Sequence, residues 1–440
     1  MQVRQEAVYR RRRRAVLGGL GLVLAGSLTA CLATAGEDEP TPPAASSTAE
    51  DADVTADATA AAEDSGSGAD EDSGSGADED SGSGADEQAE AGGTTPEPPA
   101  VPSAQSQMER VDYITGGITP KSVVANGHGL VIANNMMYSH TATVYDTGSR
   151  ELVATLDDAV DLADYGIEGH PGTSRGAPVE AAWTEDGRYA YVSQYTMYGQ
   201  GFGVEGFDNC TPDSGVGASM LYRFDAEDMA WDQVIEVGAV PKYVDITPDQ
   251  TRVLVSNWCD STVSVVDIET AQETETIPIA AAPRGIDVMP DNTTAYVAAM
   301  YADKLFKVDL EAGTSEVAMD TPRKPRHLNL SDDGAYLYMA VSGSDTIYKI
   351  DTATDEIVDQ VESGREPRSM ILSSDGTALY VVNYYEPSVS KISTEDMQVL
   401  QKEPTDANPI GITYDPVTHT VWVACYGGSI YVFDDQAAAT

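Results

Sequence analysis

The spacing of its prolines constrains the fold of this chain more than any other feature. Seven prolines stand at the same place in a recurring pattern, each before a short alternating run: Pro120, Pro178, Pro241, Pro283, Pro325, Pro367 and Pro409. The last five follow one another at intervals of 42 residues. Each unit holds four short apolar runs bounded by turn residues, with no amphipathic helical pattern between them. Four short strands at this period predict one blade of a β-propeller, and seven units predict a closed ring.

The second strand of each unit points to a family. These strands read "YVSQ" at 191–194, "YVAA" at 296–299 and "YVVN" at 380–383. Residues 108–440 therefore resemble the YVTN-type seven-bladed β-propeller repeat family, most closely over 241–440, although no unit spells the four letters themselves. The resemblance implies an all-β domain built from seven blades, each a four-stranded antiparallel sheet.

The two ends of this domain complement each other. The last unit stops at "FDDQAAAT" (433–440), after its third strand. The segment "MERVDYITGG" (108–117) precedes the first unit and matches the last strand of the other units. We expect this N-terminal strand to pair in the final blade, because that pairing closes the ring and removes an exposed strand edge.

The beginning of the chain has the layout of an export signal. Five consecutive arginines (10–14) lead into an apolar run that is too short to span a membrane and that ends at Cys31. "LTAC" (28–31) resembles the bacterial lipobox, which implies cleavage before Cys31 and lipidation of its sulfur. "RRAVL" (13–17) is also similar to a twin-arginine signal. We therefore expect residues 1–30 to be a lipoprotein signal peptide and the mature protein to be extracytoplasmic, lipid-anchored to the cell membrane.

Residues 31–107 form a region of different composition. "EDSGSGAD" occurs three times in tandem at 63–86, and Ala, Pro, Ser and Gly fill much of the remainder. Such a sequence cannot bury a core, so it predicts a disordered acidic tether that holds the propeller away from the membrane. Residues 108–440 carry 52 acidic and 19 basic residues. This charge disfavours nucleic acid as a partner and favours a soluble monomer.

One stretch departs from the acidic background. "TPRKPRH" (321–327) leads into the fifth blade, and five of the seven residues that follow the anchor prolines are basic: Lys121, Lys242, Arg284, Arg326 and Arg368. In a propeller, the blade connections share one face, the top, with the loops between second and third strands. The top loops also carry His327, Trp258, Tyr301, Tyr384 and Tyr385. Cations with aromatic residues are typical of binding hot spots.

Two interpretations of these cations stand side by side. Proline–arginine can be a habit of the repeat, with each cation paired to a carboxylate of a neighbouring blade. Alternatively, the cations form a positive funnel that captures an anionic small molecule, glycopolymer or protein at the top face without catalysis. The sequence favours this second interpretation and predicts a binding protein that requires no cofactor.

Catalysis is the main alternative. Some seven-bladed relatives are lactonases or metal-dependent lyases, and Asp245 and Asp287 occupy equivalent positions near the ring axis. A soft-metal site that includes Met136, Met137 and histidines is a minor alternative, although the ligands lack tight spacing. "GTSRG" (172–176) matches a nucleophile pattern but precedes no helix, as such a nucleophile would require.

The remaining predictions concern structure. Cys210 and Cys259 lie in matching loops of neighbouring blades, so we expect a disulfide between them, whereas Cys425 ends a core strand and is expected to be a free thiol. Six aspartates end the third strand of their units, and we expect each to cap its own turn: Asp146, Asp225, Asp267, Asp309, Asp351 and Asp434.

Overall fold

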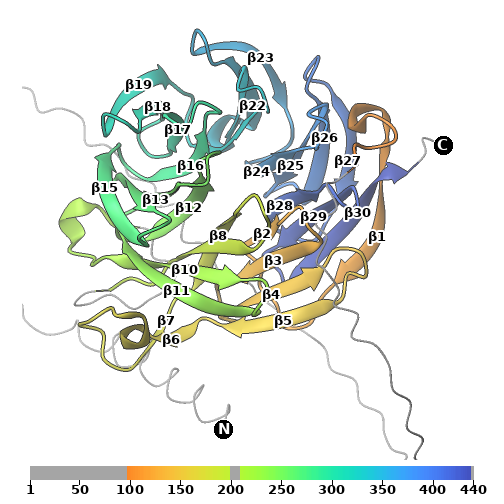
Figure 1. Ribbon diagram of the computed structural model, residues 1–440. Coiled ribbons are helices and arrows are strands. Elements are labelled where there is room, and N and C mark those ends of the chain that lie inside the picture. The colour runs from red at the N-terminus through yellow and green to blue at the C-terminus, as the bar shows by residue number, and fades with distance from the viewer. Residues whose placement is uncertain (1–96, 199–208, 438–440) are drawn as a thin grey trace, which may run out of the picture. The chain divides into compact units, whose positions relative to one another are not determined.

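The computed structural model describes residues 97–198 and 209–437. These residues form seven four-stranded antiparallel sheets arranged as the blades of a ring, which confirms the predicted fold class (Figure 1). The predicted signal peptide, Cys31 and most of the predicted tether lie outside the described residues. Within the described part of the chain, no helix has the length and apolar character needed to span a bilayer.

The first strand of each blade is its innermost. Blade 1 comprises β2 (Ser122–Ala125), β3 (Leu130–Asn135), β4 (Thr141–Asp146) and β5 (Leu152–Asp157). Blade 2 comprises β8 (Pro178–Trp183), β9 (Tyr189–Gln194), β10 (Ser219–Asp225) and β11 (Ala230–Val237). Blade 3 comprises β12 (Pro241–Ile246), β13 (Arg252–Asn257), β14 (Thr262–Asp267) and β15 (Gln272–Pro278). Blade 4 comprises β16 (Pro283–Val288), β17 (Thr294–Ala299), β18 (Lys304–Asp309) and β19 (Thr314–Asp320).

Three blades complete the ring. Blade 5 comprises β20 (Pro325–Leu330), β21 (Tyr336–Val341), β22 (Thr346–Asp351) and β23 (Glu356–Glu362). Blade 6 comprises β24 (Pro367–Leu372), β25 (Ala378–Asn383), β26 (Ser388–Ser393) and β27 (Val399–Pro404). Blade 7 comprises β28 (Pro409–Asp415), β29 (Thr420–Cys425), β30 (Ser429–Ala437) and β1 (Gln107–Ile114). The described residues also contain a hairpin of β6 (Ala159–Asp161) and β7 (Thr173–Arg175). One 3₁₀ turn, η1 (Ser103–Gln105), precedes β1, and three lie between strands: η2 (Leu162–Tyr165), η3 (Pro212–Ser214) and η4 (Ser342–Ser344).

Burial explains why the strands differ in composition. The middle strands are covered on both faces by the neighbouring blades, so β25 reads "ALYVVN" and every one of its residues is buried. The outermost strands face solvent, and β23 reads "EIVDQVE" with almost every residue exposed. The predicted turn caps are also present: Asp146 accepts a hydrogen bond from Ser149 N at 2.7 Å, and Asp267 accepts one from Thr270 N at 2.7 Å.

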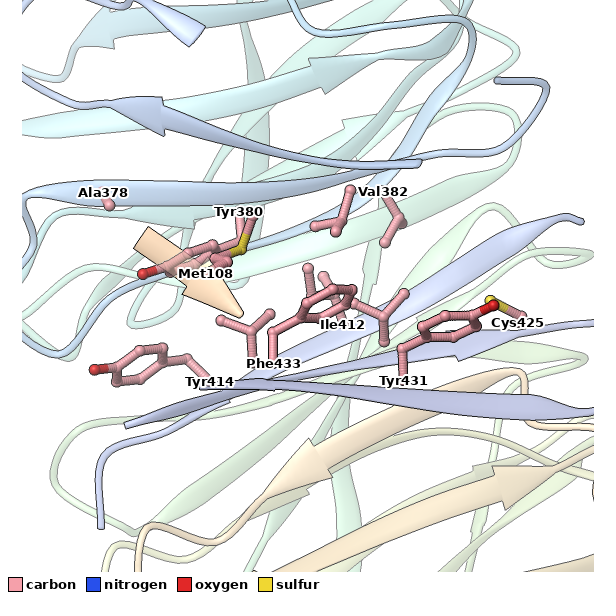
Figure 2. Close-up of a cluster of buried hydrophobic side chains, with 12 residues drawn as sticks. Met108, Ala378, Tyr380, Val382, Ile412, Tyr414, Cys425, Tyr431 and Phe433 are labelled. Atoms are coloured by element: carbon pink, nitrogen blue, oxygen red, sulfur yellow. The ribbon is translucent and has the colours of Figure 1, made fainter. Parts of the chain in front are cut away.

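The N-terminal strand closes the ring as predicted. β1 pairs antiparallel with β30, so blade 7 joins the two ends of the domain. Met108 of β1 packs in an apolar cluster with Tyr380 of blade 6 and Phe433 of blade 7 (Figure 2). Closure therefore buries side chains from the first and last segments of the fold together.

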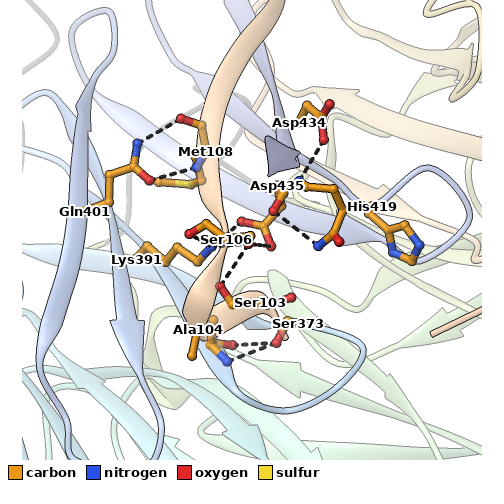
Figure 3. A network of polar contacts seen from close by, with 12 residues as sticks. Ser103, Ala104, Ser106, Met108, Ser373, Lys391, Gln401, His419, Asp434 and Asp435 are labelled. Atoms are coloured by element: carbon orange, nitrogen blue, oxygen red, sulfur yellow. Dashed lines mark hydrogen bonds and ion pairs between the residues drawn. The ribbon is translucent and has the colours of Figure 1, made fainter. Parts of the chain in front are cut away.

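The ordered domain begins earlier than its composition indicated. Ser103 and Ser106, in the predicted tether, are buried against blades 6 and 7. Ser103 N donates to Asp375 Oδ2 at 2.8 Å, and Lys391 Nζ reaches both Ser106 and Asp435 (Figure 3). We call residues 101–108 the clasp. The sequence did not predict the clasp, because the clasp has the same small, polar residues as the tether. Its contacts with blades 6 and 7 distinguish it from the tether.

The top face has a repeated backbone contact. The loop after the second strand donates to the residue before the anchor proline, as from Trp258 N to Val240 O at 3.0 Å and from Tyr384 N to Glu366 O at 3.0 Å. Val240 and Glu366 both have positive φ, at 56° and 54°. These bonds confirm that the loops and the blade connections share one face, and they fix the start of each inner strand.

Candidate functional site: a charge cluster on the inner strands

The predicted cations are buried more deeply than an open funnel requires. The exposed fractions of Lys121, Lys242 and Arg326 are 8%, 5% and 6%. Arg284 is half-buried. Lys121, Lys242 and Arg326 are therefore covered rather than open to solvent. The first residue of each inner strand lies beneath the top loops, and those loops cover it.

Four of the cations lie close enough to influence one another. Burial lowers the pKa of Lys121 well below its usual range, and the charges of Arg284, Arg326 and Lys242 act in the same direction. Lys121 belongs to blade 1, whereas Arg284 and Arg326 belong to blades 4 and 5. Residues from non-adjacent blades can meet only across the ring axis. The four side chains therefore converge at the centre of the ring.

Two further ionisable side chains, those of Glu180 and His327, have these cations as charged neighbours. Burial raises the pKa of Glu180 to about 7, although Lys121 and Ser122 favour its charged form. Burial lowers the pKa of His327 to about 3, and Arg284, Lys121 and Arg326 reinforce the effect. His327 Nδ1 is buried without a hydrogen-bond partner among the described residues. We call Lys121, Glu180, Lys242, Arg284, Arg326 and His327 the axial cluster.

The two aspartates that the sequence offered for catalysis accept backbone hydrogen bonds from neighbouring inner strands. Asp245 accepts hydrogen bonds from Ile246 N and from Val288 N of the next blade, both at 2.9 Å. Asp287 accepts one from Leu330 N at 2.7 Å. Burial raises the pKa of Asp245 to about 7 and that of Asp287 well above its usual range. The Asp245 carboxylate thus links β12 to β16, and the Asp287 carboxylate links β16 to β20.

Arg368 differs from the other predicted cations. Its Nε donates to Glu366 Oε1 at 2.9 Å, and its guanidinium carbon lies 3.4 Å from the ring centre of Tyr384. Tyr385 packs edge-on against Tyr384, with ring centres 5.0 Å apart. Arg368 therefore pairs with an acidic and an aromatic neighbour within the protein, as the first interpretation of these cations expected.

The predicted aromatic residues divide in the same way. Trp258 is buried, and the cations of Lys242 and Arg284 lie 5.3 and 5.7 Å from its ring centre. Tyr301 packs edge-on against Trp258 at 5.0 Å and is half exposed. Trp258 also belongs to an apolar cluster of Met136, Met137, Met197, Met300 and other top-loop residues. This cluster covers one side of the axial cations.

Cysteines and histidines complete the top face. Cys210 and Cys259 form a disulfide with a Cα–Cα distance of 5.1 Å, and Cys425 is a buried free thiol. His140 Nδ1 lies 2.8 Å from Asp158 Oδ2, and His170 packs against Tyr198. Residues 97–198 and 209–437 contain no group of three or more His, Cys, Asp or Glu side chains arranged to hold a metal ion.

Sequence reasoning missed Glu180 because it stands in the one early unit whose anchor proline is followed by valine rather than a cation. An alignment of the second residue after each proline could have found it. That position holds Glu180, Tyr243 and His327 in three blades, and Ser122, Gly285, Ser369 and Gly411 in the others. Large polar residues at an inner-strand position are the available signal.

Comparisons with known proteins support the propeller fold and do not identify an activity. A family profile described as "Lactonase, 7-bladed beta-propeller" matches residues 210–362, about a third of the chain. No curated protein matches. Hydrazine synthase from Kuenenia stuttgartiensis is similar in structure, with a TM-score of 0.56 and 15% sequence identity over 72% of this chain and 96% of that chain. At this identity the likeness concerns the fold alone, and a propeller fold hosts many functions.

Proposed function

We propose that the propeller binds a small anionic molecule at the axial cluster. The observation that carries this proposal is the gathering of Lys121, Lys242, Arg284 and Arg326 near one another on the inner strands, with Glu180 beside Lys121 and Arg284. Lysine and arginine side chains donate charge-assisted hydrogen bonds to carboxylates and phosphates. Several such side chains close together therefore offer a small anion several donors at once.

The burial of the cluster also favours one class of ligand. A glycopolymer or a protein surface needs exposed cations, whereas Lys121, Lys242 and Arg326 are almost completely covered. A compact carboxylate or phosphate can enter between side chains that a polymer cannot reach. Arginine suits such ligands because its planar fork binds two oxygens at once.

Binding of small anions by the purified domain tests this proposal. Citrate, phosphate and gluconate would be titrated by calorimetry against the wild type and the single variants Arg284→Gln and Arg326→Gln. Arg368→Gln is the matched control, since Arg368 occupies the equivalent position but pairs with Glu366. We expect at least one anion to bind, with a loss of roughly tenfold or more in the first two variants. Undiminished binding by folded Arg326→Gln would contradict the proposal.

The proposed cellular setting rests on the N-terminal sequence. A lipid on Cys31 and the acidic tether would hold the propeller outside the cell at a distance from the membrane. Cys31→Ser should move the protein from the membrane fraction to the soluble fraction. A variant that remains in the membrane fraction would refute lipid anchoring.

A lactonase- or lyase-like activity at the same cluster is the second candidate. Glu180 and His327 share Lys121 and Arg284 as charged neighbours, and the raised pKa of Glu180, about 7, suits a group that accepts and returns a proton. The family profile match over residues 210–362 agrees with this candidate. Turnover of an anionic lactone, lost in Glu180→Gln while binding persists, would establish catalysis. Binding without turnover would leave the first proposal standing alone.

A further inference from the structure

A groove lies where the ring is closed, away from the axial cluster. It runs between the link from β1 to β2 and the outer half of blade 1. We call it the seam groove, and it is lined by Ile114, Thr115, Gly116, Gly117, Ile118, Ser139, Thr141, Thr143, Tyr145, Arg150, Leu152 and Thr155. Hydroxyl groups dominate this lining, and its one charged side chain is that of Arg150.

The hydroxyls form an ordered array. Thr141, Thr143 and Tyr145 alternate along β4 and therefore share one face of the blade. Thr143 stands opposite Thr155 of β5. Asn135 Nδ2 donates to Thr141 Oγ1 at 3.3 Å and to Thr143 Oγ1 at 3.1 Å. Thr141 Oγ1 accepts from Asn135, so the Thr141 hydroxyl still has a proton to donate, whereas the Thr143 hydroxyl also bonds the Tyr145 hydroxyl.

Blade 3 shows what normally covers such an array. Asn257 Nδ2 donates to Ser264 Oγ at 2.8 Å, as Asn135 does to Thr143. There Gly238 of the blade connection packs so closely that a Cβ on it would lie 2.5 Å from the Asn257 side chain. The equivalent glycine of blade 1, three residues before its anchor proline, is Gly117.

The seam lacks this cover. A Cβ on Gly117 would have no atom within 4 Å beyond its own chain neighbours. Blade 6 resembles blade 3 rather than blade 1, since a Cβ on Gly364 would lie 2.6 Å from Asn383. Gly117 thus leaves open space beside its Cα at the seam, although its carbonyl accepts from Ser139 Oγ at 2.7 Å, and blades 3 and 6 lack this space.

Arg150 supplies the charge. It belongs to the hairpin turn between β4 and β5, and its Nε atom is buried without a hydrogen-bond partner among the described residues. No ion pair joins Arg150 to any described carboxylate, in contrast to Arg188, which pairs with Asp225 and Glu227. A buried donor that lacks an acceptor indicates that an acceptor comes from outside.

We propose that the seam groove binds an acidic glycan, with sugar hydroxyls on the threonine array and a sugar carboxylate on Arg150. The array follows β4, whose six residues extend about 20 Å, a length that suits a chain of sugar units better than a single compact anion. Leu152, 54% exposed, and Ile114 offer apolar contacts to the C–H faces of the rings. This site is independent of the proposed anion site at the axis.

Titration with trigalacturonate tests the proposal, with maltotriose as the neutral trimer and inorganic phosphate as the bare anion. We expect trigalacturonate to bind the wild type more tightly than either of the other two. Arg150→Gln should weaken trigalacturonate at least tenfold and bring it to the level of maltotriose. Thr155→Val, which removes an exposed hydroxyl, should weaken both trimers about threefold.

Two controls separate the groove from other cationic sites. Arg188→Gln removes an exposed arginine that is paired with acids, and Arg326→Gln removes an axial cation. Both variants should bind trigalacturonate as the wild type does. Absence of trimer binding by the wild type, equal binding of phosphate, or full binding by folded Arg150→Gln would each overturn the assignment. A loss in Arg326→Gln alone would move the glycan site to the axis.

Discussion

The clasp packs on one buried cation, whereas the axial cluster gathers several. Beneath the clasp, Lys391 and Asp435 are fully buried, and Lys391 Nζ donates to Asp435 Oδ1 at 2.6 Å, to Ser106 Oγ at 2.9 Å and to Ser106 O at 3.1 Å. One cation is thus paired with one carboxylate, and each ammonium proton has an acceptor. At the axis, several cations lie near one another, and the carboxylate of Glu180 has Lys121 and Arg284 as charged neighbours.

The two regions differ in the electrostatic neighbours of their buried lysines. Burial lowers the pKa of Lys391 and raises that of Asp435, while each residue favours the charged form of the other. This neutral pair lies beneath the clasp and links blades 6 and 7. At the axis, burial lowers the pKa of Lys121, and the charges of Arg284, Arg326 and Lys242 lower it further. An anion bound there, as we propose, would oppose that shift.

Removal of the closing strand should have the largest effect. A chain that begins at residue 118 lacks both the clasp and β1, so it exposes the edge of β30 and the apolar cluster around Met108. We expect aggregation or the loss of cooperative unfolding, measured by thermal denaturation and size-exclusion chromatography. Unchanged thermal unfolding would show that closure does not stabilise the ring.

Removal of one charge of the Lys391–Asp435 pair beneath the clasp should have the next largest effect. Lys391→Met leaves Asp435 buried without its cation, which typically costs about 3–5 kcal/mol of unfolding free energy. Lys391→Met combined with Asp435→Leu should recover part of this loss, because no buried charge then remains. Denaturant unfolding of the two single variants and the double variant measures the coupling. Additive losses would contradict an electrostatically complete pair.

Removal of one axial charge should have a smaller effect on stability. Arg326→Gln relieves repulsion at Lys121 but gives up the contacts of Arg326, among them that of Nη1 with Met300 Sδ at 3.9 Å. We expect the loss of unfolding free energy without ligand to be smaller than in Lys391→Met, because the relieved repulsion offsets part of the lost contacts. A loss as large as that of Lys391→Met would make the axial cluster structural and end the contrast with the clasp.

The smallest expected effect is a change in how the melting temperature depends on pH when Glu180 is replaced. The folded-state pKa of Glu180, about 7, lies above its ordinary value of 4.5. Its contribution to stability is therefore full below about pH 4.5 and is lost as the pH rises through 7. Glu180→Gln should flatten the fall in melting temperature between pH 5 and 8, although Asp245 contributes a fall of the same sign.

His327 provides the control of opposite sign. Its folded-state pKa of about 3 lies below the ordinary value of 6.5, so its contribution is present above pH 6.5 and is lost as the pH falls toward 3. His327→Gln should reduce acid destabilisation and leave the range above pH 7 unchanged. Identical pH profiles for both variants and the wild type would show that neither group is as buried as the structure indicates.

The sequence by itself determined the propeller. A period of 42 residues, four apolar runs per unit and one missing final strand leave little freedom, because each blade must cover its neighbours and the last must close the ring. Closure by the segment at 108–117 followed from the same reasoning. The sequence also indicated which loop positions would carry cations and aromatic residues on the top face.

Only the tertiary structure decided how those residues are used. Arg326 and Arg368 follow equivalent prolines, yet Arg326 is buried toward the axis and Arg368 pairs with Glu366 and Tyr384. Local pattern cannot separate the two, because the difference lies in which side chains of other blades reach each position. The clasp, Glu180 and the seam groove were missed for the same reason. Burial, pKa and unfilled space depend on packing between segments far apart in the chain, and a repeat pattern describes each segment alone.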